Sequence, residues 1–547
     1  MRLYDALAAI CAREAPGTCF ALLGDANMAF ATRLGEAGVR MIHVRHEHAA
    51  AAAAMAYARK EGTVGLATVT CGPGLTQLMT ALPAAVRARI PLVVVAGEAP
   101  LKAAWYNQAI DQAPFVAATG AAYRALHLPE RMPTDLRDAF VQARRERRPV
   151  VVGVPFDLQS RAWEGDLPAP SSDLVPAPSP IPPHPDDLAA AAALVDGAER
   201  VVVMAGLGAA EAGAAEDCIA LADAVGGLLA TTLPARGLFA GHPFSLNVAG
   251  GFSSDIAREC LGQADLVVAV GASLAKHNSD GGTLWPKASL LQIDTDPVIL
   301  SQGRIAADAH LRADAALGAR ALAGAVARQA GWRSDNLAHR IATEPADGSA
   351  FEPTPGRHDP RDVIAALEAA LPQDWEMVNS SGHCSYYAAH MPSRPHERFL
   401  TIREFGAIGN GTSFAMGVAA ARPDRPVVLF DGDGSLLMHV QELETMRREG
   451  LRVLTVVLND GAYGSEIHKL RADGLSDAGA VFGDTDLASI ARGFGIGGAR
   501  VTDLAEIPAL ARAFAASEGP ELWDFPVSDK VFSPVIRRAH PELAAKG

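Results

Sequence analysis

Two acidic turns in the last third of the chain could carry chemistry. The stretch VVLFDGDGSL (427–436) sets an aspartate, Asp433, between two glycines directly after a run of strand-forming residues. A tight turn needs the glycines but not a second acid. After a further helical stretch and strand, NDGAYG (459–464) carries Asp460. Because parallel strands joined by a helix end at the same edge of a sheet, we expect the two aspartates to meet there.

Two carboxylates at one sheet edge suit a hard cation. Mg²⁺ prefers oxygen ligands in octahedral geometry and takes its other ligands from phosphate, water and main-chain carbonyls. Gly434 would let the backbone approach a ligand closely, and Ser435 with the N-terminus of the following helix would offer donors and a positive dipole to a diphosphate. The segment therefore predicts one half of a metal–diphosphate clamp.

The rest of the chain supplies elements that could position such a clamp. Short β-branched runs with Gly-rich ends alternate with Ala-rich helical stretches, among them GLATVT, PLVVVAGE, PVVVGVP, RVVVMAGLG and DLVVAVGAS. Continuous apolar strands separated by helices predict parallel sheets covered on both faces, and hence an α/β fold class with doubly wound sheets. Around the clamp, we expect one helix over 435–450 and a strand over 451–458.

Two segments interrupt this rhythm and divide the chain. The segment 167–187 is so rich in proline that we expect an extended linker, and a second segment, 331–357, mixes Pro, Gly and polar residues. The expected domains are 1–165, 188–330 and 358–535. The two outer domains open with a similar helix and strand pattern, which hints at a shared topology.

Composition limits the class of protein. With 547 residues, 49% of them hydrophobic, the chain can build several cores. The net charge of −14, without a basic stripe, argues against a nucleic acid partner. The six cysteines form no C-x-x-C pair, and no apolar run is long enough to span a bilayer. We therefore expect a soluble cytoplasmic protein with no membrane partner.

Together these residues resemble the thiamine-diphosphate enzymes of the acetolactate synthase, pyruvate decarboxylase and benzoylformate decarboxylase type. The signature of that family is G-D-G, a spacer of this size and an asparagine pair; here it stands as G-D-G around Asp433 and N-D at Asp460. Asp in place of the second Asn keeps the oxygen ligand and adds a negative charge. The resemblance spans about 1–535 and implies thiamine diphosphate and Mg²⁺, with Asp433, Asp460 and the carbonyl of Ala462 as metal ligands.

The resemblance also assigns cofactor contacts. Glu47, in VRHEHAAAAAAMAYARKEG, matches the family's glutamate that protonates N1′ of the aminopyrimidine, although alone it would be an ordinary first-turn helix acid. Ile408 matches the wedge that bends the cofactor, and the carbonyl of Gly406 the acceptor for its 4′-amino group. Because the acid and the clamp lie in different domains, and family members bind cofactor between subunits, the resemblance implies a homodimer or a dimer of dimers, that is, a homotetramer.

The substrate pocket resembles two branches of the family. Asp25 and Glu466 match the active-site acids of pyruvate decarboxylases, which favour protonation and aldehyde release. Their His-His pair is missing, and in AAWYNQAIDQAPF the residue Gln108 fits the F-Q-x-x-D pattern of acetolactate synthases, with Asn107 in place of Phe. His468 is a further candidate for the pocket. Read alone, Asp25 is equally a turn acid, and Glu466 and His468 are helix-surface residues.

A flavin site in the central third is possible but disfavoured. MAGLGAAEAG carries Gly206 and Gly208 without the third glycine of the dinucleotide fingerprint. The run from Gly271 to Leu274 reads G-A-S-L, where acetolactate synthases have G-A-R-F beside FAD. The sequence therefore gives FAD only weak support.

We expect a thiamine-diphosphate- and Mg-dependent 2-oxo acid decarboxylase or carboligase, acetolactate synthase-like in overall sequence, that breaks and forms C–C bonds through an enamine. In class this is a lyase or transferase. Its partners would be a small 2-oxo acid and an aldehyde or ketone acceptor. A flavin-dependent enzyme of the pyruvate oxidase type and a non-catalytic homologue are the alternatives. Motifs do not distinguish between an aldehyde and an acyloin product, because pocket shape decides it.

Overall fold

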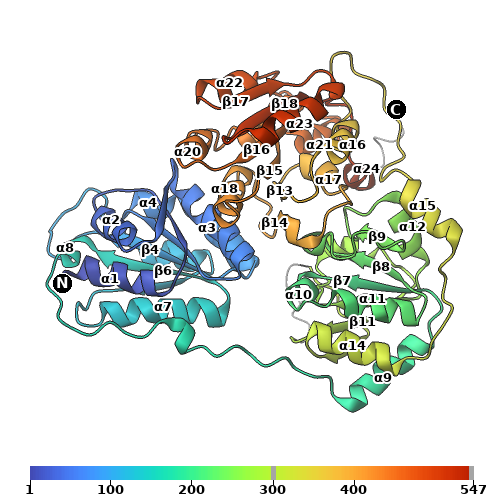
Figure 1. The fold of residues 1–547 in the computed structure, drawn as a ribbon, viewed down its shortest axis with the longest axis horizontal. Coiled ribbons are helices and arrows are strands. Elements are labelled where there is room, and N and C mark those ends of the chain that lie inside the picture. The colour runs from blue at the N-terminus through green and yellow to red at the C-terminus, as the bar shows by residue number, and fades with distance from the viewer. Residues whose placement is uncertain (297–302, 541–547) are drawn as a thin grey trace.

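The computed structural model describes residues 1–296 and 303–540. It contains three α/β domains, each built on a six-stranded sheet whose strands all run parallel (Figure 1). The predicted fold class, α/β with three doubly wound parallel sheets, is confirmed. Among the described residues, no helix is long and apolar enough to cross a membrane.

The first domain has the strand order β2-β1-β3-β4-β6-β5. Its elements are α1 (Leu3–Arg13), β1 (Thr18–Ala21), α2 (Met28–Glu36), β2 (Arg40–His43), α3 (Glu47–Glu61), β3 (Gly65–Val69), α4 (Pro73–Thr76), α5 (Ala81–Arg87), β4 (Leu92–Glu98), α6 (Gln112–Ala118), β5 (Ala122–Ala125), α7 (Met132–Glu146), β6 (Pro149–Pro155) and α8 (Phe156–Gln159). Val94 packs in the core with α3 and α5, whereas Val93 and Val95 pack in the core with α1, α2 and α7. The strands are apolar on both sides because helices cover both faces.

The central domain has a different strand order, β12-β11-β10-β7-β8-β9. Its elements are α9 (Pro185–Asp196), β7 (Val201–Ala205), α10 (Leu207–Glu211), α11 (Ala215–Ala224), β8 (Leu228–Thr231), β9 (Ser245–Val248), α12 (Asp255–Gln263), β10 (Leu266–Val270), α13 (Lys276–Ser279), β11 (Ser289–Asp294), β12 (Ala309–Arg312), α14 (Ala315–Ala325) and α15 (Asp335–Thr343). Val203 packs with α9, α11 and α14, and Val202 with α12.

The C-terminal domain repeats the topology of the first, with the strand order β14-β13-β15-β16-β18-β17. Its elements are α16 (Pro360–Ala370), β13 (Glu376–Asn379), α17 (Cys384–Ala388), β14 (Phe399–Thr401), α18 (Gly411–Ala421), β15 (Val427–Gly432), α19 (Asp433–Leu436), α20 (Glu442–Arg448), β16 (Val453–Asn459), α21 (Gly464–Ala472), α22 (Leu487–Gly493), β17 (Gly497–Arg500), β18 (Glu521–Pro526), α23 (Ile507–Ala516) and α24 (Pro534–Ala539). The similar openings of the two outer domains therefore reflect one shared strand order.

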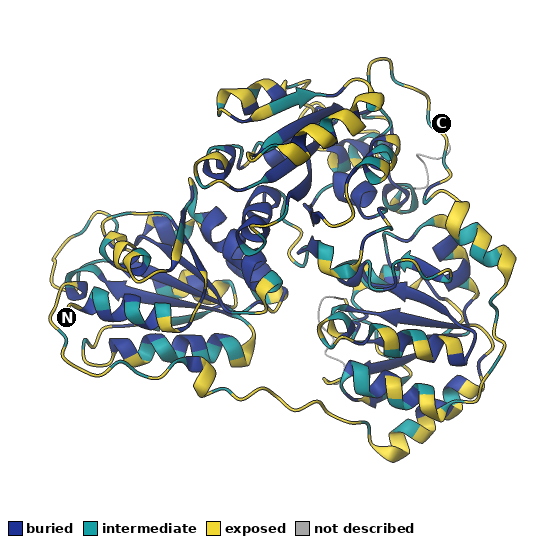
Figure 2. Cartoon of the chain, viewed as in Figure 1, coloured by how far each residue is buried: buried dark blue, intermediate teal, exposed yellow. Residues whose placement is uncertain are grey.

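The first and C-terminal domains share an apolar core where α3 packs against α18. Both helices are buried along almost their whole length (Figure 2). Small residues allow this, since a Cβ on Gly417 would overlap the main-chain carbonyl of Ala53. Lys60 at the end of α3 adds a buried ion pair with Glu376 of β13, with 2.6 Å between Nζ and Oε2. The domain that carries Glu47 is thus held firmly against the domain that carries the acidic turns.

Two local predictions differ from the structure. The expected helix over 435–450 is broken, because α19 ends at Leu436 and α20 begins at Glu442. The segment 331–357, expected to interrupt the α/β pattern and divide two domains, contains α15, whose N-cap Ser334 accepts a hydrogen bond from the Leu337 N–H at 3.2 Å. Sequence composition hid this helix, since its apolar residues face the central domain while its other side is polar.

Candidate cofactor site

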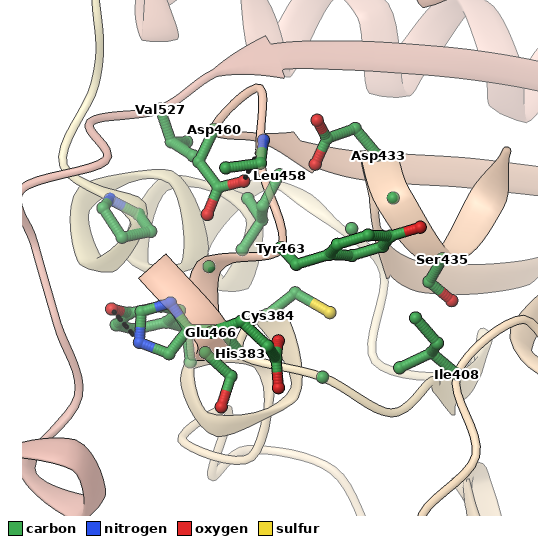
Figure 3. Close-up of a pocket in the computed structure, with 18 of the residues that line it drawn as sticks. His383, Cys384, Ile408, Asp433, Ser435, Leu458, Asp460, Tyr463, Glu466 and Val527 are labelled. Atoms are coloured by element: carbon green, nitrogen blue, oxygen red, sulfur yellow. Dashed lines mark hydrogen bonds between the residues drawn. The ribbon is translucent and has the colours of Figure 1, made fainter. Parts of the chain in front are cut away.

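The two acidic turns meet at one edge of the C-terminal sheet. Asp433 follows β15 and Asp460 follows β16, and Gly432 at the end of β15 pairs in parallel register with Leu458, the next-to-last residue of β16. The aspartates therefore leave the sheet side by side, as the βαβ geometry requires. Figure 3 shows both carboxylates at the rim of the same pocket.

Asp433 is not fully satisfied by the protein. It is 1% exposed, and in the described chain its Oδ2 has no hydrogen-bond partner. Asp460, which is partly buried, accepts the N–H of Ala462 through Oδ1 at 3.2 Å. Burial raises the pKa of both carboxyls, and the charge of Asp433 raises that of Asp460 further. Two neighbouring acids, one of them with a spare oxygen, fit a divalent cation, which would relieve their repulsion and desolvation.

A cation held here would need further oxygen ligands. Within residues 1–296 and 303–540, no group of three or more His, Cys, Asp or Glu side chains could hold a metal. Main-chain carbonyls, water and phosphate would have to complete the shell of Mg²⁺, which commonly binds through one or two carboxylates. The donor set thus fits a cation that brings a phosphorylated ligand with it.

The turn beside the aspartates is shaped by small residues. Ser435 accepts the main-chain N–H of Gly409 at 2.9 Å and lies 3.2 Å from the hydroxyl of Ser380. This bond fixes the Gly-rich loop that carries Ile408 against the pocket (Figure 3). A Cβ on Gly434 would lie 2.7 Å from the ring of Tyr463. The turn therefore has room for glycine only while Tyr463 stays in place.

His383 is a pocket residue that the sequence analysis missed. It follows β13, which lies next to β15, and its Nε2 accepts the main-chain N–H of Ser533 at 3.1 Å. Burial lowers the pKa of His383 to about 3, so the ring is neutral and its proton sits on Nδ1. In Figure 3 the ring lies beside Cys384 at the floor of the pocket. The strand order could have revealed it, because β13 ends at the same edge as the acidic turns.

Comparison with known proteins agrees with this geometry. Residues 1–115 match the N-terminal TPP binding domain of thiamine pyrophosphate enzymes, residues 188–322 the central domain, and residues 380–525 the C-terminal TPP binding domain. A probable acetolactate synthase 2 of Oryza sativa is 30% identical over 92% of this chain and 79% of its own. The chain belongs to the thiamine pyrophosphate enzyme family.

Other relatives carry similar names. A probable acetolactate synthase of Mycobacterium bovis is 30% identical over 91% of each chain. An acetolactate synthase large subunit of Parasynechococcus marenigrum is 29% identical over 86% of this chain and 77% of its own. The predicted resemblance to thiamine-diphosphate enzymes of the acetolactate synthase type is confirmed. The family and the names of the relatives support an enzyme.

In this thiamine pyrophosphate enzyme, the C-terminal pocket gathers seven of the predicted site residues. Glu466 lines it from α21, although its side chain is 55% exposed and lies 3.4 Å from the amine of Lys469. His468 lies behind the pocket wall, buried against His383 and Phe532 with ring centroids 5.0 Å and 5.4 Å away. The predicted residues that line the pocket are Ile408, Asp433, Gly434, Ser435, Asp460, Ala462 and Glu466.

A second group of predicted residues lies on the first domain. Gln108 accepts a hydrogen bond from the thiol of Cys71 at 3.3 Å, and Asn107 beside it is exposed. Burial raises the pKa of Cys71, and the nearby charge of Asp25 adds to the shift. In Figure 1, α2 and α4 beside this group lie at the left, whereas α17 and α21 beside the pocket lie at the upper right. One chain therefore does not bring the two groups together.

Glu47 is the first residue of α3. The residues that line the C-terminal pocket lie between Pro360 and Val531, so within the described part of one chain Glu47 is not among them. Gly406, exposed and with φ of 70°, lies in the loop before Ile408 but not at the pocket wall. The family match gives this chain one N-terminal and one C-terminal TPP binding domain, and in the described part of one chain no residue of the first lines the C-terminal pocket.

The glycines of the central domain serve loop packing. A Cβ on Gly206 would overlap the carbonyl of Gly271, and the N–H of Gly208 donates to that carbonyl at 3.0 Å. The N–H of Gly208 is therefore engaged within the central domain, and the two glycines allow the loops after β7 and β10 to pack closely.

Proposed function

We propose that this enzyme is a thiamine-diphosphate- and Mg-dependent decarboxylase or carboligase of 2-oxo acids, similar to acetolactate synthase. One observation supports it above the others: two carboxylates lie side by side at the edge of the C-terminal sheet, and the buried one, Asp433, keeps an oxygen without a partner in the described chain. Family membership gives that edge a diphosphate ligand. The names of the relatives support a carboligase.

The C-terminal domain would hold the metal and the diphosphate. Asp433, Asp460 and the carbonyl of Ala462 would bind Mg²⁺, while Ser435 and the main chain at Gly434 would meet the diphosphate. Figure 3 supports this arrangement, since Asp433, Asp460 and Ser435 surround one opening. The buried position of these groups would keep water from competing with the phosphate oxygens.

The remaining contacts would orient the cofactor ring. Ile408, held at the pocket by the bond between Ser435 and Gly409, would keep the cofactor bent, and the carbonyl of Gly406 would accept its 4′-amino group. When bound, thiamine diphosphate supplies addition to the ketone carbon of a 2-oxo acid and storage of the electron pair left by CO₂. Glu47 would hold and return the proton at N1′, which the chemistry requires.

A second copy of the chain would complete the pocket. Glu47, Asp25, Asn107 and Gln108 would come from the first domain of that copy, because one chain leaves them away from the C-terminal pocket. Large apolar side chains are exposed on both the first and the C-terminal domain, among them Trp105 at 79%. Such side chains favour burial between subunits. A homodimer is therefore the smallest active unit proposed, and a homotetramer would pair two of them.

The substrate would be a small 2-oxo acid, with an aldehyde or ketone as a second substrate. Glu466 at the pocket rim and Asp25 from the second copy would donate protons to, or accept them from, the substrate's reacting oxygen and carbon atoms. Asn107, Gln108 and His468 would shape the space for the acceptor. These residues set whether the product is an aldehyde or an acyloin.

Incubation of the enzyme with thiamine diphosphate, Mg²⁺ and a panel of 2-oxo acids tests this function. Each acid is supplied with and without an acceptor aldehyde, and products are identified by mass spectrometry. We expect CO₂ release that requires both cofactors. Glu47→Gln should keep the fold and lose about 10²- to 10⁴-fold in rate, because a neutral amide cannot cycle a proton. Cofactor-independent turnover, or a fully active Glu47→Gln variant, contradicts the proposal.

A further inference from the structure

The turn that delivers Glu47 is held by the C-terminal domain of the same chain. Residues 44–46 connect β2 to α3, and side chains of α20 bind this turn and the end of β2. The carboxylate of Glu442 in α20 receives the main-chain N–H of Arg45, with its two oxygens 3.0 Å and 3.2 Å from the nitrogen. Arg45 precedes Glu47 by two residues, so this bond fixes the backbone at the point where the catalytic acid leaves it.

Other residues of α20, and Glu449 directly after it, bind the same part of the chain. Glu449 accepts the main-chain N–H of His43 at 3.2 Å, and Arg448 donates to the carbonyl of His43. Glu444 forms an ion pair with the Arg45 side chain at 2.6 Å. Main-chain groups at the end of β2 and in the turn are therefore bound by side chains in and just after α20. Because several directional hydrogen bonds act on the same short stretch, they fix its position against the C-terminal domain.

Glu442 differs from its neighbours in this contact. It is fully buried, at 0% exposure, whereas the side chain of Glu444 is 18% exposed. In the described residues Glu442 has no ion pair, and the hydroxyl of Thr445 donates to it at 2.7 Å. Burying a carboxylate without a counter-ion costs folding free energy unless its hydrogen bonds compensate. The groups it serves are the N–H groups that precede α3.

We infer that Glu442 is a positioning residue for Glu47, holding the turn before α3 so that the catalytic acid of each subunit projects at a fixed height and angle. The inference rests on the proposed function, in which Glu47 meets the cofactor. Displacement of a catalytic group by about 1 Å can cost about 100-fold in rate, so a rigid turn has a direct kinetic value. No contact between Glu442 and substrate or cofactor is required.

The electrostatics of Glu442 give the inference a pH signature. Burial raises the pKa of Glu442 to about 7, against the lowering effects of the Thr445 hydroxyl, the N–H groups of Arg45 and His46, and the charge of Arg448. Above this pKa the carboxylate accepts the Arg45 N–H with full charge. As the pH falls through it, Glu442 gains a proton, the bond weakens, and Glu47 loses its fixed position.

The test measures hydrogen–deuterium exchange at C2 of thiamine diphosphate bound to the holoenzyme, between pH 5.5 and about pH 8.5, a range centred on the raised pKa. Glu442→Gln is compared with Glu444→Gln, a matched change two residues away. In the wild type, the exchange rate should fall as the pH drops through about 7, and we call this fall the acid limb. We expect Glu442→Gln to slow exchange about tenfold above pH 7, because one charge-assisted hydrogen bond is lost, and to abolish the acid limb. Glu444→Gln should change the rate less than about fivefold and keep the limb.

The outcomes separate this inference from the proposed function. If Glu47→Gln exchanges at the wild-type rate, Glu47 is not the catalytic acid and both proposals fail. If Glu47→Gln is inactive but Glu442→Gln keeps the wild-type rate and acid limb, only the positioning role is wrong. A parallel loss of thiamine diphosphate affinity in Glu442→Gln and Glu444→Gln would also overturn it. Should Glu442→Gln not fold, Thr445→Val removes a hydroxyl that lowers the pKa of Glu442, so it must move the acid limb to higher pH, and an unmoved limb would overturn the inference.

Discussion

The first and C-terminal domains share one strand order, yet corresponding strand ends carry opposite chemistry. β15 and β16 of the C-terminal domain lead into Asp433 and Asp460, and Asp433 is buried with an oxygen that has no partner in the described chain. β4, the counterpart of β16, ends in Glu98, whose carboxylate binds His127 at 2.6 Å and the hydroxyl of Tyr123. The acid of the first domain is satisfied internally, whereas Asp433 of the C-terminal domain is not.

This difference shows that topology places a sheet edge but does not make it a site. Both domains bring strand ends together, and in both a carboxylate stands at such an end. What separates them is whether the buried acid finds its partner within the domain. This chain thus uses one scaffold twice, once with its strand-end acid paired inside the domain and once with a strand-end acid that keeps an unpaired oxygen in the described residues.

Replacing an acid at each of the two corresponding edges gives the largest expected contrast. Asp433→Ala should weaken Mg²⁺ and thiamine diphosphate binding by more than about 100-fold, beyond the usual effect of losing an outer-shell partner, and abolish turnover. Glu98→Gln should leave cofactor affinity unchanged but lower stability by about 1–3 kcal/mol, because His127 and Tyr123 lose a charged partner. Calorimetric titration and thermal unfolding of both variants measure this. Equal losses of cofactor affinity would remove the distinction between the edges.

The contact between the two outer domains should be the next most sensitive feature. Lys60 and Glu376 are 7% and 0% exposed, and Arg398 lies 3.0 Å from the other oxygen of Glu376. Lys60→Met removes one partner of a buried pair and should cost about 3–5 kcal/mol. Arg33→Met, which breaks an exposed pair with Asp5 inside the first domain, should cost less than about 1 kcal/mol. Urea unfolding compares the two, and similar losses would mean that the buried pair does not join the domains.

Much of this arrangement follows from local sequence rules. Continuous apolar runs predicted parallel sheets because helices cover both faces, and the βαβ rule predicted that Asp433 and Asp460 would meet. His383 was missed because its role depends on which strand neighbours β15, and strand order is not written in any one segment. The contact of Glu442 with Arg45 joins residues 397 positions apart, so no spacing could have indicated it.

The break between α19 and α20 also escaped prediction. Apolar residues continue through this stretch at helical spacing, and none of its residues is Gly or Pro. Val440 and Leu437 pack against the core shared with the first domain, so tertiary contacts decide where the chain leaves the helix. Periodicity therefore found the element but not its interruption.

Glycines at corresponding strand ends should differ in a smaller but measurable way. Gly72 follows β3 with φ of 60°, and a Cβ there would overlap the carbonyl of Gln108. Gly72→Ala should therefore destabilise the first domain by about 1–3 kcal/mol. Gly434→Ala meets the side-chain rings of Tyr463 and Phe482 rather than backbone, and these rings can shift, so stability should change by less than about 1 kcal/mol while cofactor affinity falls. Restored affinity in the double variant with Tyr463→Leu would confirm the steric cause, and a stability loss larger than that of Gly72→Ala would contradict it.

The smallest expected effect concerns histidines, which the two domains treat differently. His127 of the first domain contacts Glu98, whereas His390 of the C-terminal domain is held against Tyr386, and within the described chain its Nε2 has no partner. Burial lowers the pKa of His390 to about 4. Between pH 6.5 and pH 4 the unfolded chain therefore binds a proton that the folded protein does not, and stability falls as the pH falls.

His390→Leu should remove this pH dependence. Relative to wild type, the variant should gain up to about 1.4 kcal/mol of unfolding free energy per pH unit on acidification below pH 6.5. Denaturant titrations of both proteins at several pH values measure that difference directly. A gap between the two proteins that stays constant with pH would mean that His390 is protonated in the folded state. In that case His390 would have a partner in the C-terminal domain. The two domains would then differ in how they bind their strand-end acids but not in how they bind their histidines.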